Sequence, residues 1–115
     1  MKKVLLVEDD QVIQMGWMVL LEDLPLQLLQ ARDISQARDL FYDNPDLDAV
    51  VMDGCVPGVE LNTANLTMEI RKRFAGPMIA VSSEPDFRRA LVQAGCDYAC
   101  DKNLVPDKLI QLLGL

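Results

Sequence analysis

The sequence predicts an α/β protein with a doubly wound, five-stranded parallel sheet and helices on both faces. Short apolar runs alternate with segments whose apolar residues recur at helical spacing, and this alternation repeats through five strand–helix units. The runs are continuously apolar, as expected where helices cover both faces of a parallel sheet. The chain has 115 residues, half of them hydrophobic, which is close to the most common size of a single domain.

The first unit begins with the apolar run Val4–Val7, which acidic residues end. The next segment, Gln11–Leu24, is expected to be a helix, because Asp10 can cap its N-terminus and Pro25 cannot continue it. Its buried stripe should consist of apolar residues at i, i+4, i+7, i+8 and i+11: Ile13, Trp17, Leu20, Leu21 and Leu24.

The other four units show the same alternation, with Gly and Pro between the elements. Strands are expected at Leu26–Ala31, Ala49–Met52, Met78–Ser83 and Asp97–Cys100. Helices are expected at Ser35–Tyr42 (with Ser35 as a candidate cap), Leu61–Phe74, Asp86–Ala94 and Pro106–Leu113. In such a sheet, functional residues collect beyond the carboxyl ends of the strands.

Composition excludes several classes of function. The formal net charge is −7, which argues against a nucleic-acid surface and against binding to anionic membranes. No apolar run approaches the roughly 20 residues that span a bilayer, and Val4–Val7 is too short for a signal peptide, so we expect a cytoplasmic protein. The chain has no histidine, which excludes mixed Cys/His zinc sites and His-based triads. Its cysteines are expected to be reduced: Cys55, Cys96 and Cys100.

Polar residues follow four of the five expected strands. They are Glu8, Asp9 and Asp10 after the first strand, Asp53 after the third, Ser82 and Ser83 at the end of the fourth, and Asp101 and Lys102 after the fifth. Because parallel strands share one carboxyl edge, these side chains should converge. Several carboxylates in one pocket repel each other unless a cation is bound, and oxygen ligands with open positions suit Mg²⁺.

This arrangement favours chemistry at phosphorus. Lys102 and Ser82 could hold phosphoryl oxygens, and a carboxylate in this setting can attack phosphorus to give an aspartyl-phosphate. Taken alone, Asp53 could also be a helix cap or a turn residue. A flavin or dinucleotide site would need a Gly-rich or Ser/Thr-rich phosphate loop where the chain reads "EDDQ". A haloacid dehalogenase-type phosphatase would need a second Asp where the chain has Cys55.

In this order, the segments resemble the receiver domain of two-component response regulators. "VLLVEDD" is similar to the family's first strand and acidic pair, and "DAVVMDGCVPG" to its phosphoacceptor strand, with Pro four residues after Asp. "PMIAVSS" is similar to the family's fourth strand, and "AGCDYACDK" to the stretch that ends in its lysine. The resemblance covers essentially the whole chain and implies a flavodoxin-like sheet with strand order 2-1-3-4-5.

The resemblance also implies a role for each residue at the sheet edge. Asp53 would be the phosphoacceptor. Ser82 would bind the phosphoryl group and change position with it, and Lys102 would contact the phosphoryl oxygens. Four groups would bind magnesium: Glu8 (through water), Asp9, Asp53 and the backbone carbonyl of Cys55.

The implied function is that of a Mg²⁺-dependent phosphoacceptor in a two-component phosphorelay. It would take its phosphoryl group from a phosphohistidine partner and assist its own phosphorylation and dephosphorylation, without being classed as an enzyme. The donor would be a histidine kinase or a histidine phosphotransfer protein, docking through Met15, Met18 and Val19, which lie off the core stripe of the first helix. A downstream protein partner is also implied. We expect one receiver domain over residues 1–115, no output domain and no DNA binding.

Departures from the family pattern keep other interpretations open. Asn103 follows the lysine where the family usually has Pro. Ala99 occupies the place of the family's switch aromatic, and Tyr98 should face the other side of the strand unless the register slips. The span from Ser82 to Lys102 is shorter than usual, and the loop "PGVELNTANL" lacks the usual glycine. The alternatives are a degenerate receiver that acts as a phosphorylation-independent interaction module and a small phosphatase of another doubly wound family.

Overall fold

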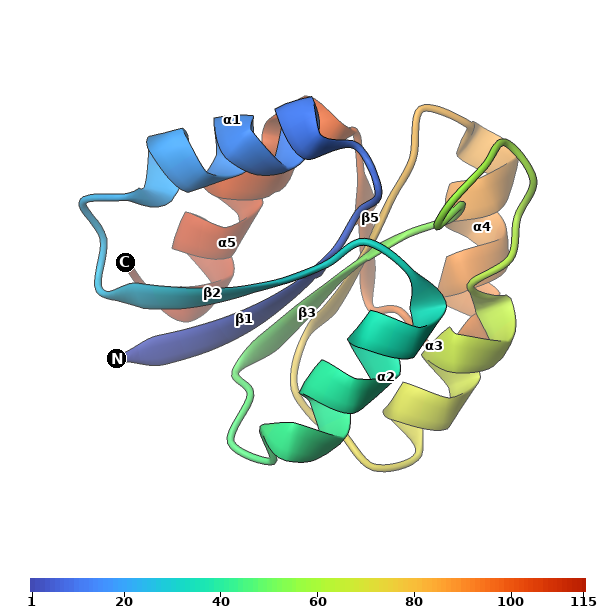
Figure 1. The fold of residues 1–115 in the computed structure, drawn as a ribbon, viewed down its shortest axis with the longest axis horizontal. Coiled ribbons are helices and arrows are strands. Elements are labelled where there is room, and N and C mark those ends of the chain that lie inside the picture. The colour runs from blue at the N-terminus through green and yellow to red at the C-terminus, as the bar shows by residue number, and fades with distance from the viewer.

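The computed structural model describes residues 1–115 as a five-stranded sheet between two layers of helices (Figure 1). The strands are β1 (Lys2–Val7), β2 (Leu26–Ala31), β3 (Ala49–Asp53), β4 (Met78–Val81) and β5 (Tyr98–Cys100). The helices are α1 (Gln11–Leu21), α2 (Ile34–Asp43), α3 (Ala64–Arg71), α4 (Pro85–Ala94) and α5 (Val105–Leu113), with a 3₁₀ turn over Lys102–Leu104. All strand pairs are parallel, in the order β2-β1-β3-β4-β5, as the sequence and its resemblance predict.

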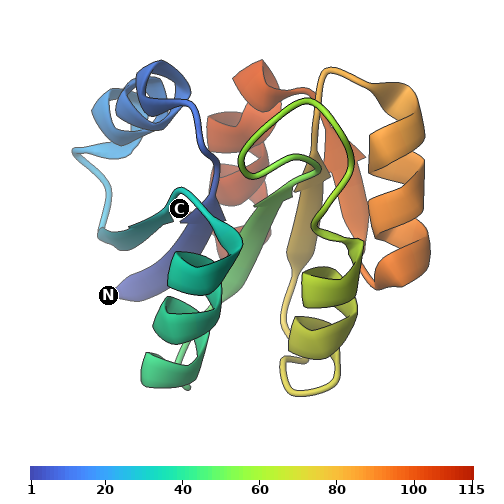
Figure 2. The same cartoon turned by 45° about the vertical axis from the view of Figure 1, so that its right-hand side comes forward.

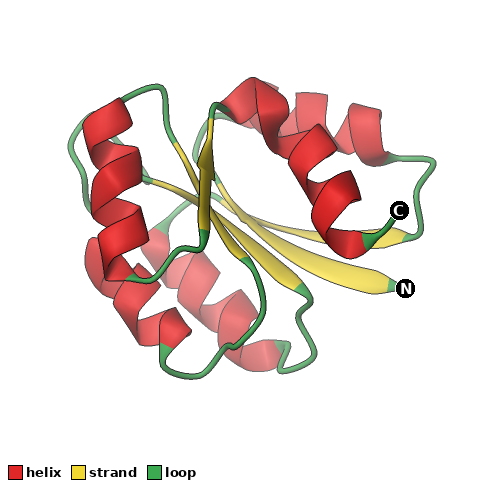
Figure 3. Cartoon of the chain, turned by 180° about the vertical axis from the view of Figure 1, so that it is seen from behind, coloured by secondary structure: helices red, strands yellow, loops and turns green.

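Helices cover both faces of the sheet. Helices α1 and α5 lie on one face and α2, α3 and α4 on the other, as Figures 1 and 2 show. The view from behind in Figure 3 shows the twisted sheet between the two layers. Alternate residues of β1 serve the two sides: Leu5 and Val7 enter the core under α2, α3 and α4, whereas Val4 and Leu6 enter the core under α1 and α5. This double burial explains why the strands are continuously apolar.

The sheet reverses its strand order between β1 and β3. These strands lie side by side with Val7 paired to Met52, so the next residues, Glu8 and Asp53, emerge next to each other at the carboxyl edge. The topology therefore places the first candidate site residues together at the switch point of the sheet.

Helix α1 differs from its expected form in two respects. Asp10 caps it as predicted, its carboxylate accepting hydrogen bonds from the backbone N–H groups of Val12 and Ile13. However, the helix ends at Leu21 rather than Leu24, and the prediction that Leu20 is buried is wrong, since it is 67% exposed. Leu20 lies about 100° around the helix from Leu21, beyond the stripe that the sheet covers.

Side-chain hydrogen bonds to the backbone explain two further corrections. Helix α2 begins at Ile34 and is capped by Asp33 rather than Ser35, because the Asp33 carboxylate accepts the N–H of Gln36. Helix α3 begins at Ala64 rather than Leu61, because the preceding residues bind the loop after β3 instead of joining the helix. Strands β4 and β5 are each shorter than expected, β4 ending at Val81 and β5 beginning at Tyr98.

No helix has both the length and the apolar composition needed to cross a bilayer.

Candidate functional site

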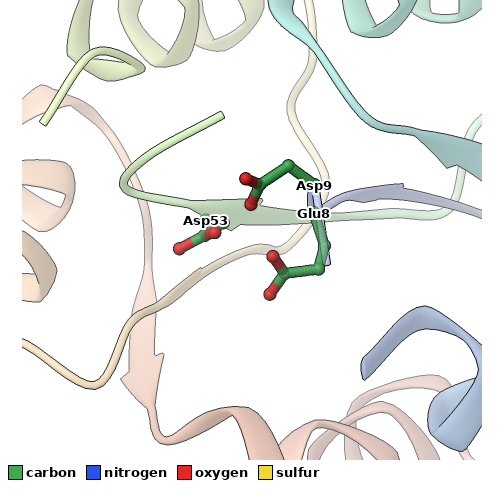
Figure 4. A group of neighbouring side chains, drawn as sticks. All are labelled: Glu8, Asp9 and Asp53. Carbon is green, nitrogen blue, oxygen red and sulfur yellow. The ribbon is translucent and has the colours of Figure 1, made fainter. Parts of the chain in front are cut away.

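Three carboxylates converge at the carboxyl edge of the sheet. One oxygen from each of Glu8, Asp9 and Asp53 lies within 4.8 Å of the others. Figure 4 shows the three side chains turned toward one common space, Glu8 and Asp9 from the end of β1 and Asp53 from the end of β3. Glu8 and Asp53 are buried, while Asp9 is partly exposed. The cluster is thus open to solvent on the Asp9 side.

Lys102 enters the same space from the turn after β5. Its Nζ lies 2.7 Å from Glu8 Oε1 and donates a hydrogen bond to Asp53 Oδ2 at 3.2 Å. Burial disfavours the ammonium charge, but the contacts with Glu8 and Asp53 outweigh it and raise the pKa of Lys102. Lys102 is therefore held as a cation between the carboxyl groups of Glu8 and Asp53.

Glu8 is buried completely, and its environment is unusual for a carboxylate. Burial raises the pKa of Glu8 to about 8, with the negative charge of Asp53 adding to the shift and the contact with Lys102 opposing it. Glu8 Oε1 accepts no well-aligned hydrogen bond, although Lys102 Nζ is close. Such an atom is left short of a partner in the protein alone.

The residues present fit a hard divalent cation such as Mg²⁺. Three carboxylates face a single ammonium group, and one buried carboxylate oxygen lacks a hydrogen bond. Burial raises the pKa of the Cys55 thiol, which disfavours a thiolate ligand at this site. The donor set is therefore made of oxygen atoms, which Mg²⁺ prefers.

Ser82 lines a cavity of about 320 Å³ together with Asp53, Cys55 and Lys102. Its hydroxyl oxygen accepts the backbone N–H of Glu84 at 3.0 Å, so its proton remains free to be donated into the cavity. A larger cavity of about 600 Å³ lies between α1 and α2. Half of its eight lining residues are glutamines and only one is acidic, so we place the candidate site in the smaller cavity.

The structure brings together every residue that the sequence nominated for the site: Glu8, Asp9, Asp53, Cys55, Ser82 and Lys102. Sequence reasoning missed the residues that hold them in place. The buried Thr63 hydroxyl donates to the carbonyl of Asp53 at 2.7 Å, and the indole N–H of Trp17 donates to the carbonyl of Lys102 at 2.8 Å. The contact of Trp17 could have been expected from the sequence, because a buried indole N–H usually requires a hydrogen-bond acceptor.

Gln14 was missed as well. It lies in the buried face of α1, where its amide donates to the carbonyls of Leu6 and Glu8 at 3.1 Å. The sequence did not indicate that this polar residue is buried. Its side-chain amide is tolerated in the core only because it donates hydrogen bonds to these carbonyls.

The register of β5 shows where Tyr98 and Ala99 lie. Tyr98 pairs with Ile79 and Ala99 with Ala80, with no slip. Tyr98 faces α5, where the ammonium of Lys108 lies 4.5 Å from the centre of its ring. Tyr98 therefore does not occupy the position where the resemblance places an aromatic residue. That position is Ala99, on the α4 side of the strand.

A family model described as the response regulator receiver domain matches residues 4–114. Among solved structures, the chain is similar to the receiver domain of a sensor histidine kinase from Pseudomonas aeruginosa PAO1, which has a magnesium ion coordinated in its active site cleft. The two are 25% identical with a TM-score of 0.79, over 99% of this chain and 98% of that chain. No curated protein matches the chain significantly.

Two further structures are similar in fold. A two-component response regulator from Clostridium difficile is 16% identical with a TM-score of 0.83, over 99% of this chain and 97% of that chain. A response regulator from Burkholderia pseudomallei, with a phosphorylated aspartic acid, a calcium ion and citrate, is 15% identical with a TM-score of 0.82. That match covers 98% of this chain and 66% of the other.

Proposed function

The chain belongs to the family of response regulator receiver domains of two-component signalling, and from this premise we propose that Asp53 accepts a phosphoryl group from a phosphohistidine of a partner protein. The observation that carries the proposal is the pair of contacts from Lys102 to Glu8 and Asp53. They place a cation beside one oxygen of Asp53, while the carboxylate still borders the cavity shared with Ser82.

In the proposed reaction, a carboxylate oxygen of Asp53 attacks the phosphorus of the phosphohistidine. The new P–O bond forms as the P–N bond breaks, and the electron pair of that bond returns to the imidazole nitrogen. Lys102 neutralises charge on the phosphoryl oxygens, and the free hydroxyl proton of Ser82 is donated to another of them. Water later hydrolyses the aspartyl-phosphate in the same pocket, so the domain assists both steps on itself and is not classed as an enzyme.

We propose Mg²⁺ as the resident cation, held by Glu8, Asp9, Asp53 and the carbonyl of Cys55, with Glu8 acting through water. When bound, it would neutralise the clustered carboxylates and the incoming phosphoryl oxygens. The buried oxygen of Glu8 without a hydrogen bond, and the excess of carboxylates over ammonium groups, support this part of the proposal.

The exposed face of α1 is proposed as the docking surface for the histidine kinase or phosphotransfer partner. Helix α1 contains no charged residue, and Met15, Met18 and Val19 are all exposed. This face starts directly beside the site, because α1 follows Asp9 and Asp10 in the chain. A partner helix packed on it would be held next to Asp53. The phosphorylated domain would then act on a downstream protein partner, and we place the reaction in the cytoplasm.

The reaction can be tested with a small phosphodonor. The folded protein is incubated with acetyl phosphate, with Mg²⁺ or with EDTA, and the intact mass is measured. A one-phosphate shift that requires Mg²⁺ is expected for the wild type, and none for Asp53→Asn. A folded wild-type protein that gains no phosphate would favour the alternative, an interaction module that works without phosphorylation.

A further inference from the structure

Arg88, on the first turns of α4, joins two segments of the proposed phosphoryl site. Its Nη1 donates hydrogen bonds to the carbonyl of Ser82 at 2.7 Å and to Asp101 Oδ1 at 2.6 Å. Ser82 is the proposed hydroxyl ligand, and Asp101 directly precedes Lys102 in the chain. One guanidinium nitrogen therefore connects the end of β4 with the end of β5.

The bond to Asp101 is a short ion pair between a largely buried guanidinium and a carboxylate at the surface. The Arg88 side chain is 22% exposed and the Asp101 side chain 59% exposed, so the contact fixes the position of Arg88 more than it adds stability. The neighbouring Arg89 differs, since its side chain is 69% exposed and pairs only with Asp86 on the same helix. Both arginines place a positive charge on α4, but only Arg88 contacts the site. Arg89 can therefore serve as a control for the effect of charge alone.

Helix α4 also packs against the residue that follows the proposed acceptor. A Cβ on Gly54 would lie 3.1 Å from Phe87 Cβ, so the backbone after Asp53 comes close to α4. The first turns of α4 therefore touch the ends of β3, β4 and β5. Figure 1 shows the N-terminal end of α4 beside the loops at this edge of the sheet.

The α4 side of β5 carries an alanine, Ala99, rather than an aromatic side chain. Ala99 lines a cavity of about 400 Å³ together with Arg88 and Val92, where the resemblance would place an aromatic side chain. Tyr98 faces α5 instead. On the α4 side of β5, the contact that connects Ser82 with the Lys102 segment is made by Arg88.

We propose that Arg88 is a positioning residue that couples α4 to the phosphoryl site. It holds Ser82 and the Asp101–Lys102 segment in register, and it transmits their rearrangement on phosphorylation to α4. When the Ser82 hydroxyl turns to a phosphoryl oxygen, its bond with the N–H of Glu84 changes, and Glu84 is the N-cap residue of α4. This inference rests on the proposed function, because it needs a group bound at Asp53.

The test uses backbone amide NMR spectra of the whole chain with beryllofluoride and Mg²⁺ as the probe. In the wild type, amide shifts should change around Asp53 and Ser82 and also along α4. Arg88→Gln should keep the shifts around Asp53 but lose most of those along α4. Arg89→Gln, the matched control, should respond like the wild type, and Arg88→Lys should restore part of the response.

The possible outcomes distinguish the role of Arg88 from the proposed function. Wild-type shifts along α4 in Arg88→Gln, or an equal loss in Arg89→Gln, would overturn the role of Arg88. A wild type that shows no shift around Asp53 would overturn the proposed function, and the inference with it. If Arg88→Gln fails to fold, Asp101→Asn keeps the guanidinium and weakens only one of its anchors. This variant should then lose part of the α4 response, and an unchanged response would refute the coupling.

Discussion

Replacing Asp9 by Asn should stabilise the protein in the absence of a divalent cation and remove most of its response to Mg²⁺. The Asp9 carboxylate lies within 4.8 Å of carboxylate oxygens of Glu8 and Asp53. It makes no ion pair with the protein, so the substitution relieves repulsion without breaking a salt bridge. Asn is close to Asp in size, and the change therefore isolates the charge.

The size of the effect follows from Coulomb's law. Two unit charges about 4.8 Å apart repel by about 3.5 kcal/mol at an effective dielectric constant of about 20, and by about 0.9 kcal/mol at about 80. Asp9 is partly exposed and Lys102 offsets some of the repulsion, which favours the lower value. We expect the free energy of unfolding to rise by about 1 kcal/mol, or the Tm by about 4 °C for a domain of about this length.

The assay is thermal unfolding of the wild type and the variant, each in EDTA and in excess Mg²⁺. At a Mg²⁺ concentration about ten times its Kd, the wild type should gain about 1.4 kcal/mol, and Asp9→Asn should gain little. Asp39→Asn is the matched control, because Asp39 is exposed and lies outside the cluster. A variant that is less stable than the wild type in EDTA, or that keeps the full Mg²⁺ response, would refute the electrostatic reasoning.

Four further predictions concern single residues. Gly16→Ala should raise the free energy of unfolding by about 1 kcal/mol, because Gly16 is in mid-helix with nothing within 4 Å of a new Cβ. Gly95→Ala should lower the free energy of unfolding by more than about 1 kcal/mol, since the φ of Gly95 is +137° and a Cβ would lie 2.8 Å from Arg71 Cγ. Urea titrations measure both variants, and the opposite order of stability would contradict both predictions. Lys102→Met should slow phosphorylation by acetyl phosphate roughly hundredfold without weakening Mg²⁺ binding, and a wild-type rate would exclude its proposed role. Burial raises the pKa of Cys96 to about 12, so Cys96 should react with Ellman's reagent at about pH 8 only after unfolding. Because Cys55 and Cys100 are partly exposed, the labelled residue is identified by peptide mass spectrometry, and rapid labelling of Cys96 in the native protein would show otherwise.

The fold and the composition of the site could be predicted because both depend on short-range pattern. Continuous apolar runs define strands that are buried on both faces, and the polar residue that ends each run must then lie at the carboxyl edge. This reasoning nominated Glu8, Asp53 and Lys102, which make contact with one another. The pairing of Val7 with Met52 supplies the geometry that makes the first two neighbours.

What could not be predicted depends on side-chain hydrogen bonds that the folded chain brings together. The late start of α3 follows from Asn62, whose amide accepts the N–H of Val56 and donates to its carbonyl, turning the loop back toward β3. Arg88 and Asp101 are both charged residues that would ordinarily be solvated, and only the packing of α4 beside the end of β5 pairs them. Periodicity carries no information on such contacts.

The most direct test of the account is to locate the phosphoryl group on the chain. The protein is phosphorylated with acetyl phosphate and Mg²⁺, then reduced with borohydride, which converts an aspartyl-phosphate to homoserine, and its peptides are identified by mass spectrometry. The account predicts homoserine at position 53, and its absence when EDTA replaces Mg²⁺. Modification at Asp9 or Asp10 instead, or modification of Asp53 that does not depend on a divalent cation, would contradict it.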